Sequence, residues 1–186
     1  MVRLLFLVVG LVGTLLPAVA MAQAVEPLEP AVAAVIDYQR ILRDAKAAQS
    51  IRNQVEARRK RYQDQIAREE QRLHEEDKAL TKRRTILSAE AYAEKRQAFE
   101  ADVGEVQRMV QERRRQLDDV SSEALSQVRN TLIEVVGDLA ERAGFNVVLP
   151  SSGVLLFSPR IDLTEEVLTR LDAKLPDVKL SDASAD

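Results

Sequence analysis

The chain has 186 residues, no cysteine, no tryptophan and one histidine. Charged residues make up 31% of the chain and aromatic residues only 4%, so there are few bulky side chains for a compact core of this length. Without cysteine, and with His74 as the one imidazole, it has no ligand set for an ordinary zinc site. An apolar fraction of 46% argues against disorder, and we expect one domain built as an extended helical assembly.

Residues 1–22 have the form of a secretory signal peptide. One basic residue, Arg3, precedes an apolar run that ends in the small-residue cleavage pattern Ala20-Met21-Ala22. The run is short for a membrane span, so an uncleaved anchor is the less favoured alternative. Cleavage after Ala22 would export the mature protein. Residues 23–40 then form a proline-containing leader and the first strand of a small body, at 31–37.

From Ile41 onward, apolar residues recur in the alternating three- and four-residue spacing of a coiled coil. Ser88 interrupts this pattern in the manner of a helix N-cap, with Glu90 in the first turn that follows. A turn there folds residues 41–143 into an antiparallel hairpin arm with its tip near 88, in which the numbers of facing residues sum to about 178. One continuous helix in an intermolecular coil is the alternative, because a single serine is a modest stop signal.

The seam between the two helices of the arm is narrow, because polar residues occupy many of its positions. We therefore expect a weakly held hairpin, some of whose apolar groups face a partner. The expected seam residues are Val55, Tyr62, Ile66, Leu73, Leu80, Phe99, Val103, Val110 and Leu117.

Basic residues gather on the arm. Residues 40–130 hold 21 of the 27 basic and 17 of the 30 acidic residues, so the arm carries a net charge of about +4 and the remainder about −7. For any single basic run, a solvated helix face with mixed charges is the better interpretation. The difference in net charge between the arm and the body is harder to explain by chance. The basic patches are Arg58, Arg59, Lys60 and Arg61; Lys82, Arg83 and Arg84; and Arg113, Arg114 and Arg115.

Residues 144–176 are expected to complete the body. Gly144 stands where a helix C-cap glycine belongs, and the apolar runs at 145–150 and 153–159 predict a β-hairpin. A closing amphipathic helix follows, begun by an acidic capping box from Asp162 to Glu165. Its expected apolar face consists of Val167, Leu168, Leu171 and Leu175. Residues 177–186 are small, polar and acidic, which predicts a flexible tail.

Three short strands in a single chain would leave two open sheet edges. Several copies could close such strands into a shared barrel, so the body is expected to form an oligomer. The residues expected there are Val32, Val35, Phe145, Val147, Leu149, Leu155 and Phe157.

The sequence offers no catalytic arrangement. It has no glycine-rich phosphate loop, and Ser151 and Ser152 have no histidine nearby to activate them. Paired carboxylates such as Glu69 and Glu70 lie on a solvated helix face, which is a poor setting for acid–base catalysis. We therefore expect no enzyme, no cofactor and no metal. The export signal, a pI of about 5.4 and basic runs without interleaved aromatic residues also disfavour nucleic-acid binding.

Three segments together resemble the Skp/OmpH family: AVIDYQRILRDAKAAQSIRNQVE at residues 34–56, LSAEAYAEKRQAFE at 87–100, and AGFNVVLPSSGVLLFSPRIDLTEEVLTRLD at 143–172. The similarity covers residues 31–175, and the last segment is the most specific part. It implies a homotrimer in which strands of three chains form a small barrel and three hairpins surround a cavity. It also implies an ATP-independent periplasmic chaperone that holds unfolded outer-membrane β-barrel proteins until membrane assembly.

The sequence departs from this family in its charge, because family members are often strongly basic overall. The acidic body puts strong attraction to anionic lipid in doubt and leaves a weak contact with the membrane surface or lipopolysaccharide as the expectation. The expected fold class is α+β, with a long antiparallel coiled-coil hairpin arm on a small β body that forms a shared trimeric barrel. A structural coiled-coil linker of the cell envelope remains the alternative function.

Overall fold

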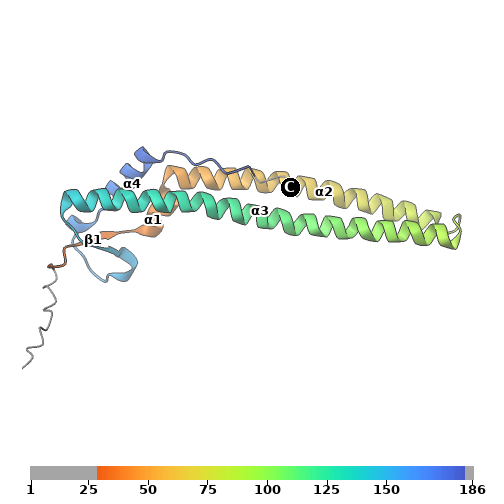
Figure 1. Cartoon of the computed structure of the whole chain (residues 1–186), viewed down its shortest axis with the longest axis horizontal. Helices are drawn as coiled ribbons and strands as arrows, with labels where there is room; N and C mark the ends of the chain where they lie inside the picture. The colour runs from red at the N-terminus through yellow and green to blue at the C-terminus, as the bar shows by residue number, and fades with distance from the viewer. Residues whose placement is uncertain (1–28, 183–186) are drawn as a thin grey trace, which may run out of the picture. The chain divides into compact units, whose positions relative to one another are not determined.

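The computed structural model describes residues 29–182. The expected signal peptide, most of the leader and residues 183–186 therefore lie outside the described residues. From Ala31 the chain forms one unit, in which a long antiparallel pair of helices carries a small body at its open end (Figure 1). The order of its elements is β1 (Ala33–Ile36), α1 (Tyr38–Asp44), α2 (Lys46–Arg83), α3 (Ala89–Ala143), β2 (Val147–Pro150), two 3-10 turns (Ser151–Gly153 and Pro159–Ile161) and α4 (Thr164–Lys174). Among residues 29–182, no helix has an apolar stretch that could cross a membrane.

The hairpin of α2 and α3 turns at residues 84–88. Ser88 is the N-cap of α3, as predicted: its hydroxyl oxygen accepts a hydrogen bond from the Ala91 N–H at 3.3 Å. Gly144 ends α3 in the left-handed conformation, with φ of 75°, which glycine adopts without steric cost. At 1.5 Å per residue, the 55 residues of α3 extend for about 80 Å.

Polar contacts between α2 and α3 establish which residues face each other. Tyr62 bonds to Gln116 at 3.2 Å, a pair whose numbers sum to the predicted value. Nearer the tip, Arg72 bonds to Asp102 at 2.9 Å and Arg96 to Asp77 at 3.4 Å, pairs with slightly smaller sums. The turn therefore lies a little before its expected centre.

The first helix of the arm is not continuous, contrary to the expectation of one helix from Ile41. Ala45 has an extended backbone, with ψ of 136°, and separates α1 from α2. The methyl side chain of Ala45 has no oxygen that could cap α2. The Asp172 carboxylate of α4 instead accepts a hydrogen bond from the Lys46 N–H at 2.8 Å. Arg52 donates to the Arg43 carbonyl in the last turn of α1 at 2.6 Å. The break is thus stabilised from outside the segment in which it occurs.

Strand pairing in the body differs from the predicted β-hairpin. β1 and β2 pair in parallel, from Ala33 opposite Val147 to Ile36 opposite Pro150. Residues 154–158 form no strand, and Asp162 bridges the other side of β1 at Val35. The third predicted strand is therefore wrong. β1 is almost wholly buried, as expected of a strand that is covered on both faces, and it takes the pairing that the hairpin prediction gave to 153–159.

The predicted capping box of α4 is also wrong. The Asp162 carboxylate accepts hydrogen bonds from both the N–H and the hydroxyl of Thr164, at 2.9 and 2.6 Å. The Thr164 hydroxyl oxygen in turn accepts from the Asp37 N–H at 2.9 Å. Glu165 turns away to Arg40, at 2.5 Å. The buried Thr164 thus joins the start of α1 to the start of α4, which holds the body against the arm.

The hydrophobic core lies where the arm joins the body. Its most deeply buried large side chains are Val35, Ile41, Ile51, Val128, Val167 and Leu171. The predicted apolar face of the closing helix is confirmed, with Val167 and Leu171 buried and Leu168 and Leu175 partly buried against the cluster. The same cluster includes Val178 and Leu180. Residues 177–182 therefore do not form the free tail that their composition predicts.

Candidate functional site: the arm and the apolar end of the body

The seam residues of the arm are packed unevenly. Of the predicted set, Leu80 alone is buried, and the others are half-buried: Val55, Tyr62, Ile66, Leu73, Phe99, Val103, Val110 and Leu117. Val106 in the middle of the arm and Val120 and Ala124 near the root are also buried. Apart from Val106, the middle of the hairpin is held by partly solvated side chains, so it has no continuous dry core. From residue 55 to 117, Ile86 in the turn is the one exposed large apolar side chain, at 80%.

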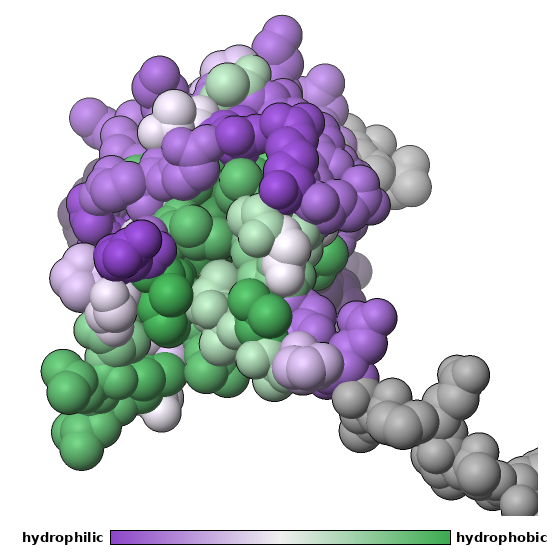
Figure 2. Space-filling view, turned by 90° about the vertical axis from the view of Figure 1, so that its left-hand side faces the viewer, coloured by the Kyte–Doolittle hydropathy of each residue, from purple (hydrophilic) through white to green (hydrophobic). Residues whose placement is uncertain are grey.

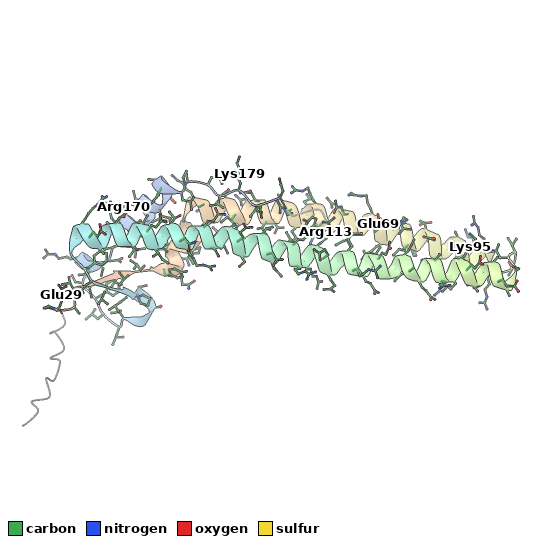
Figure 3. The ribbon with its side chains drawn as sticks, viewed as in Figure 1. Glu29, Glu69, Lys95, Arg113, Arg170 and Lys179 are labelled. Carbon is green, nitrogen blue, oxygen red and sulfur yellow. The ribbon has the colours of Figure 1, made fainter. Side chains whose placement is uncertain are left out.

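A ring contact joins the two helices midway along the hairpin, at Arg113, which is labelled in Figure 3. The Arg113 guanidinium lies over the Tyr62 ring, 4.7 Å from its centroid, and donates to the Gln116 side-chain oxygen at 2.9 Å. The Arg113 Nε is buried and has no hydrogen-bond partner among the described residues. Beside this contact lies a hollow of about 380 Å³. Its lining combines three aliphatic and three arginine side chains with an aromatic ring, an amide and one carboxylate: Arg59, Tyr62, Gln63, Ile66, Glu70, Val110, Arg113, Arg114 and Leu117.

Part of the arm's basic charge is neutralised within the chain. Arg72 lies within 3.1 Å of carboxylate oxygens of Glu69, Glu76 and Asp102. Its hydrogen bonds, first to Glu69 and then to Asp102, raise the pKa of Arg72 above its ordinary value. The hydrogen bond from Arg115, at 2.8 Å, lowers the pKa of Glu112. Such exposed pairs contribute little to stability, but they cancel local charge.

The predicted basic patches divide into paired and unpaired members. Arg59 pairs with Glu56 at 2.6 Å, and Arg58 donates to a backbone carbonyl. Within residues 29–182, no carboxylate lies within ion-pair distance of six other members of these patches. These unpaired cations are Lys60, Arg61 and Arg114 in the middle of the arm, and Lys82, Arg83 and Arg84 at its tip. The arm therefore presents two separate groups of uncompensated positive charge.

Apolar side chains gather on the end of the body (Figure 2). Leu155 is fully exposed, Leu156 is 89% exposed, and Val32 and Leu149 are exposed as well. Such a contiguous exposed apolar surface is typical of an interaction site. Of the other predicted body residues, Val147 and Phe157 are half-buried, whereas Val35 and Phe145 are buried in the chain's own core. The last two are therefore not available to another chain in this conformation.

The sequence reasoning missed several residues that the structure brings to these surfaces. Leu156 is nearly as exposed as Leu155, because residues 154–158 do not form a strand, in which neighbouring side chains would point to opposite faces. Ser50, Gln54 and Glu123 all bond to the C-terminal residues. The alternation of Val178, Lys179 and Leu180 was a signal that could have revealed that contact, since a period of two indicates an extended segment with one covered face.

We also looked for side chains at these surfaces that could bind a metal ion. In the part of the chain that the structure describes, no three His, Cys, Asp or Glu side chains are grouped so as to hold a metal ion. His74 is exposed. What the arm and the body end can provide is an extended surface of half-buried apolar groups and free cations, together with an apolar patch.

Comparisons with known proteins agree on the kind of molecule. The family model described as "Outer membrane protein (OmpH-like)" matches residues 32–171. A solved structure from Caulobacter crescentus CB15, whose description is an OmpH-like candidate outer membrane chaperone, matches with a TM-score of 0.77 and 20% identity. That match covers 88% of this chain and 97% of the other. No curated protein sequence matches the chain.

Proposed function

Because the chain belongs to the OmpH-like family, we propose that it is an ATP-independent chaperone that holds unfolded outer-membrane β-barrel proteins. We place it in the periplasm, exported by the signal peptide expected at residues 1–22. The observation that carries this proposal is the thin packing of the arm: beyond its root, half-buried seam residues join two helices over tens of ångströms. Such a hairpin can yield to clients of different shapes, whereas a rigid strut would need a continuous dry seam.

We propose a homotrimer built through the apolar end of the body. The exposed Val32, Leu149, Leu155 and Leu156 would be covered by neighbouring copies. Among the described residues, β2 pairs with β1 alone and leaves its other edge open. An open edge beside an apolar patch favours strand pairing with another chain. Three arms held at one end would then enclose a space for the client.

The unpaired cations of the arm serve to attract clients more than to hold them. Long-range attraction raises the rate of encounter, while screened surface charges add little to affinity. Acidic segments of an unfolded client are the expected targets. A weak contact with the membrane surface or lipopolysaccharide would use the same residues, at the tip, and the acidic body limits it.

The test is capture without nucleotide. Protein that starts at Gln23 should keep a urea-diluted outer-membrane β-barrel protein soluble, and it should not bind the same barrel after folding. A matched variant replaces residues 63–115 with a short turn, just beyond the Tyr62–Gln116 contact, and so leaves the buried root and body in place. That variant should remain a soluble trimer and lose capture, because many weak contacts act together only when arms surround the client.

The alternative is a coiled-coil linker of the envelope. A linker binds a folded partner at a fixed ratio and ignores unfolded chains. If the full protein binds a folded envelope protein at a fixed ratio and does not prevent aggregation, the linker becomes the better proposal. If the short-arm variant prevents aggregation as well as the full protein does, the arms are not the client-binding surface.

A further inference from the structure

The last described residues, 176–182, form an extended strap along α2 (Figure 1). The side-chain amide of Gln54 forms two hydrogen bonds with the main chain of the strap, one on each side of Lys179. The Gln54 Nε2 donates to the Val178 carbonyl at 2.7 Å, and the Leu180 N–H donates to the Gln54 Oε1 at 3.1 Å. This pair of bonds satisfies the peptide groups of an extended segment much as a neighbouring strand would.

The side chains of the strap alternate between two environments. Val178 is 3% exposed and Leu180 8% exposed, and both belong to the buried cluster that includes Ile51, Val120 and Ala124. Lys179 between them is exposed and points away from α2 (Figure 3). The strap thus has the period of two that is expected of a strand with one covered face.

Polar contacts fix the two ends of the strap to both helices of the arm. The Ser50 hydroxyl donates to the Asp177 carboxylate. The Ser181 carbonyl accepts from the Arg58 guanidinium at 2.9 Å, and the Ser181 hydroxyl donates to Glu123 of α3 at 2.8 Å. The strap therefore lies over the junction of α2 and α3, packed on the apolar cluster and flanked by hydrogen-bonding side chains. We call the surface that the strap covers the groove.

This groove is suited to any extended main chain with apolar side chains at alternate positions, and it does not require a particular sequence. The Gln54 amide binds main-chain groups that every residue except proline offers, and the floor asks only for apolar side chains at alternate positions. The strands of outer-membrane barrels carry that alternation, apolar on the lipid face and polar on the lumen face. The strap itself lies beyond the family match, which ends at residue 171.

We propose that the groove is a client-binding subsite for extended segments with apolar residues at every second position, and that the strap occupies it as an internal competitor. This inference rests on the proposed chaperone function. The strap is released when a client segment takes its place, so the chain covers its own apolar groove while no client is present. If the strap covers the groove in nine of ten molecules, its removal tightens client binding about tenfold, because the apparent affinity scales with the uncovered fraction.

The first test releases the strap without altering the groove. The double variant Val178→Asp/Leu180→Asp places two charges against the apolar floor, and the matched control Lys179→Asp makes the same change in net charge on the outward side. The probe is a fluorescent peptide of alternating valine and threonine, followed by anisotropy. The double variant should bind it several-fold more tightly than the wild type, while the control binds it as the wild type does. Hydrogen exchange of residues 177–182 reports the release directly.

The second test locks the strap in place. The chain has no cysteine, so Ser50→Cys/Asp177→Cys introduces a unique pair at side chains that bond to each other. Oxidation, or a short bifunctional thiol reagent if the disulfide does not form, should abolish peptide binding, and reduction should restore it. Peptide affinity that is unchanged by both release and locking overturns the inference and leaves the strap as a brace. Aggregation suppression by the wild type, measured alongside, separates that result from failure of the chaperone proposal.

Discussion

At the scale of single residues, side chains from distant parts of the chain complete what local sequence leaves unfinished. α2 begins after Ala45, which has no capping oxygen, and Asp172 supplies one from α4. A carboxylate at a helix N-terminus both accepts a hydrogen bond and interacts favourably with the helix dipole. The polar contacts of Asp172 and Thr164 thus fix the geometry at which the arm leaves the body.

We expect Asp172→Ala to lower the free energy of unfolding by about 1 kcal/mol, the usual cost of losing an N-cap acceptor. Asp172→Asn should lose less, because the amide oxygen can still accept. Asp118→Ala, at an exposed aspartate of α3, is the control for the change in helix propensity. Urea unfolding followed by circular dichroism measures all three. Equal stability of the Asp172→Ala and Asp118→Ala variants would contradict a capping role.

Alanine substitutions at Gly104 and Gly144 are expected to change stability in opposite directions. A Cβ at Gly104 would meet the Arg108 guanidinium at an ordinary distance of 3.7 Å, so Gly104→Ala should raise stability by about 1 kcal/mol through helix propensity. Gly144→Ala should lower it, because Gly144 has a positive φ of 75°. Thermal unfolding distinguishes the two. If Gly104→Ala also narrows the size range of captured clients, Gly104 softens the arm; an unchanged range rules that role out.

At the scale of elements, the hairpin is a sequence of packed and loosely packed sections. Its root is dry, its middle is held mostly by half-buried seam residues and polar contacts with Val106 buried among them, and Leu80 is buried near the tip. Local opening is easiest where few apolar contacts are buried. The middle of the arm is therefore expected to be its most adaptable part, while the tip is held by the buried Leu80.

Removing the buried Leu80 side chain should release the tip without unfolding the root. Leu80→Ala deletes a buried side chain, a change that typically costs 2–5 kcal/mol in a well-packed site, and we expect a value near the lower end because the arm is narrow. Amide hydrogens on both sides of the turn at residues 84–88 should exchange faster, while those around Ile51 and Val128 remain protected. The half-buried Leu73→Ala should have a smaller effect. Faster exchange at the root would show that the arm unfolds as one unit.

At the scale of the whole molecule, each surface has a different role in the function that we propose. The apolar end of the body is suited to self-association, the arm to enclosing a client, and the strap to covering the groove at the arm's root. Chain-to-chain contact at one end leaves the arms free along their length. The charge distribution supports this division, since the basic excess lies on the arm and not on the body.

Light scattering on protein that starts at Gln23 should give three times the mass of one mature chain at micromolar concentration. Leu155→Asp/Leu156→Asp should shift the protein toward monomers, because it places charges in the exposed apolar patch. Ile86→Asp, at an exposed apolar residue in the turn of the arm, is the control and should remain trimeric. A wild-type protein that is monomeric and folded under these conditions would contradict the shared-barrel proposal.

The sequence by itself determined those features that depend on neighbours within a few turns. Heptad spacing predicts the helices, Ser88 predicts where the second long helix begins, and Gly144 predicts where it ends. The apolar face of the closing helix follows from the same short-range periodicity. Half-burial of most seam residues agrees with the polar positions among them, although their part in binding a client stays a prediction.

Only the tertiary structure decided what depends on residues far apart in the chain. Ala33 pairs with Val147, more than a hundred positions away, whereas the nearby run at 153–159 forms no strand beside β2. The break at Ala45 is stabilised by Asp172, and the polar C-terminal residues are held by Gln54, a partner more than a hundred positions away. Composition describes a segment's average preference for water, whereas two buried side chains and a few hydrogen bonds at a matching surface are enough to reverse it.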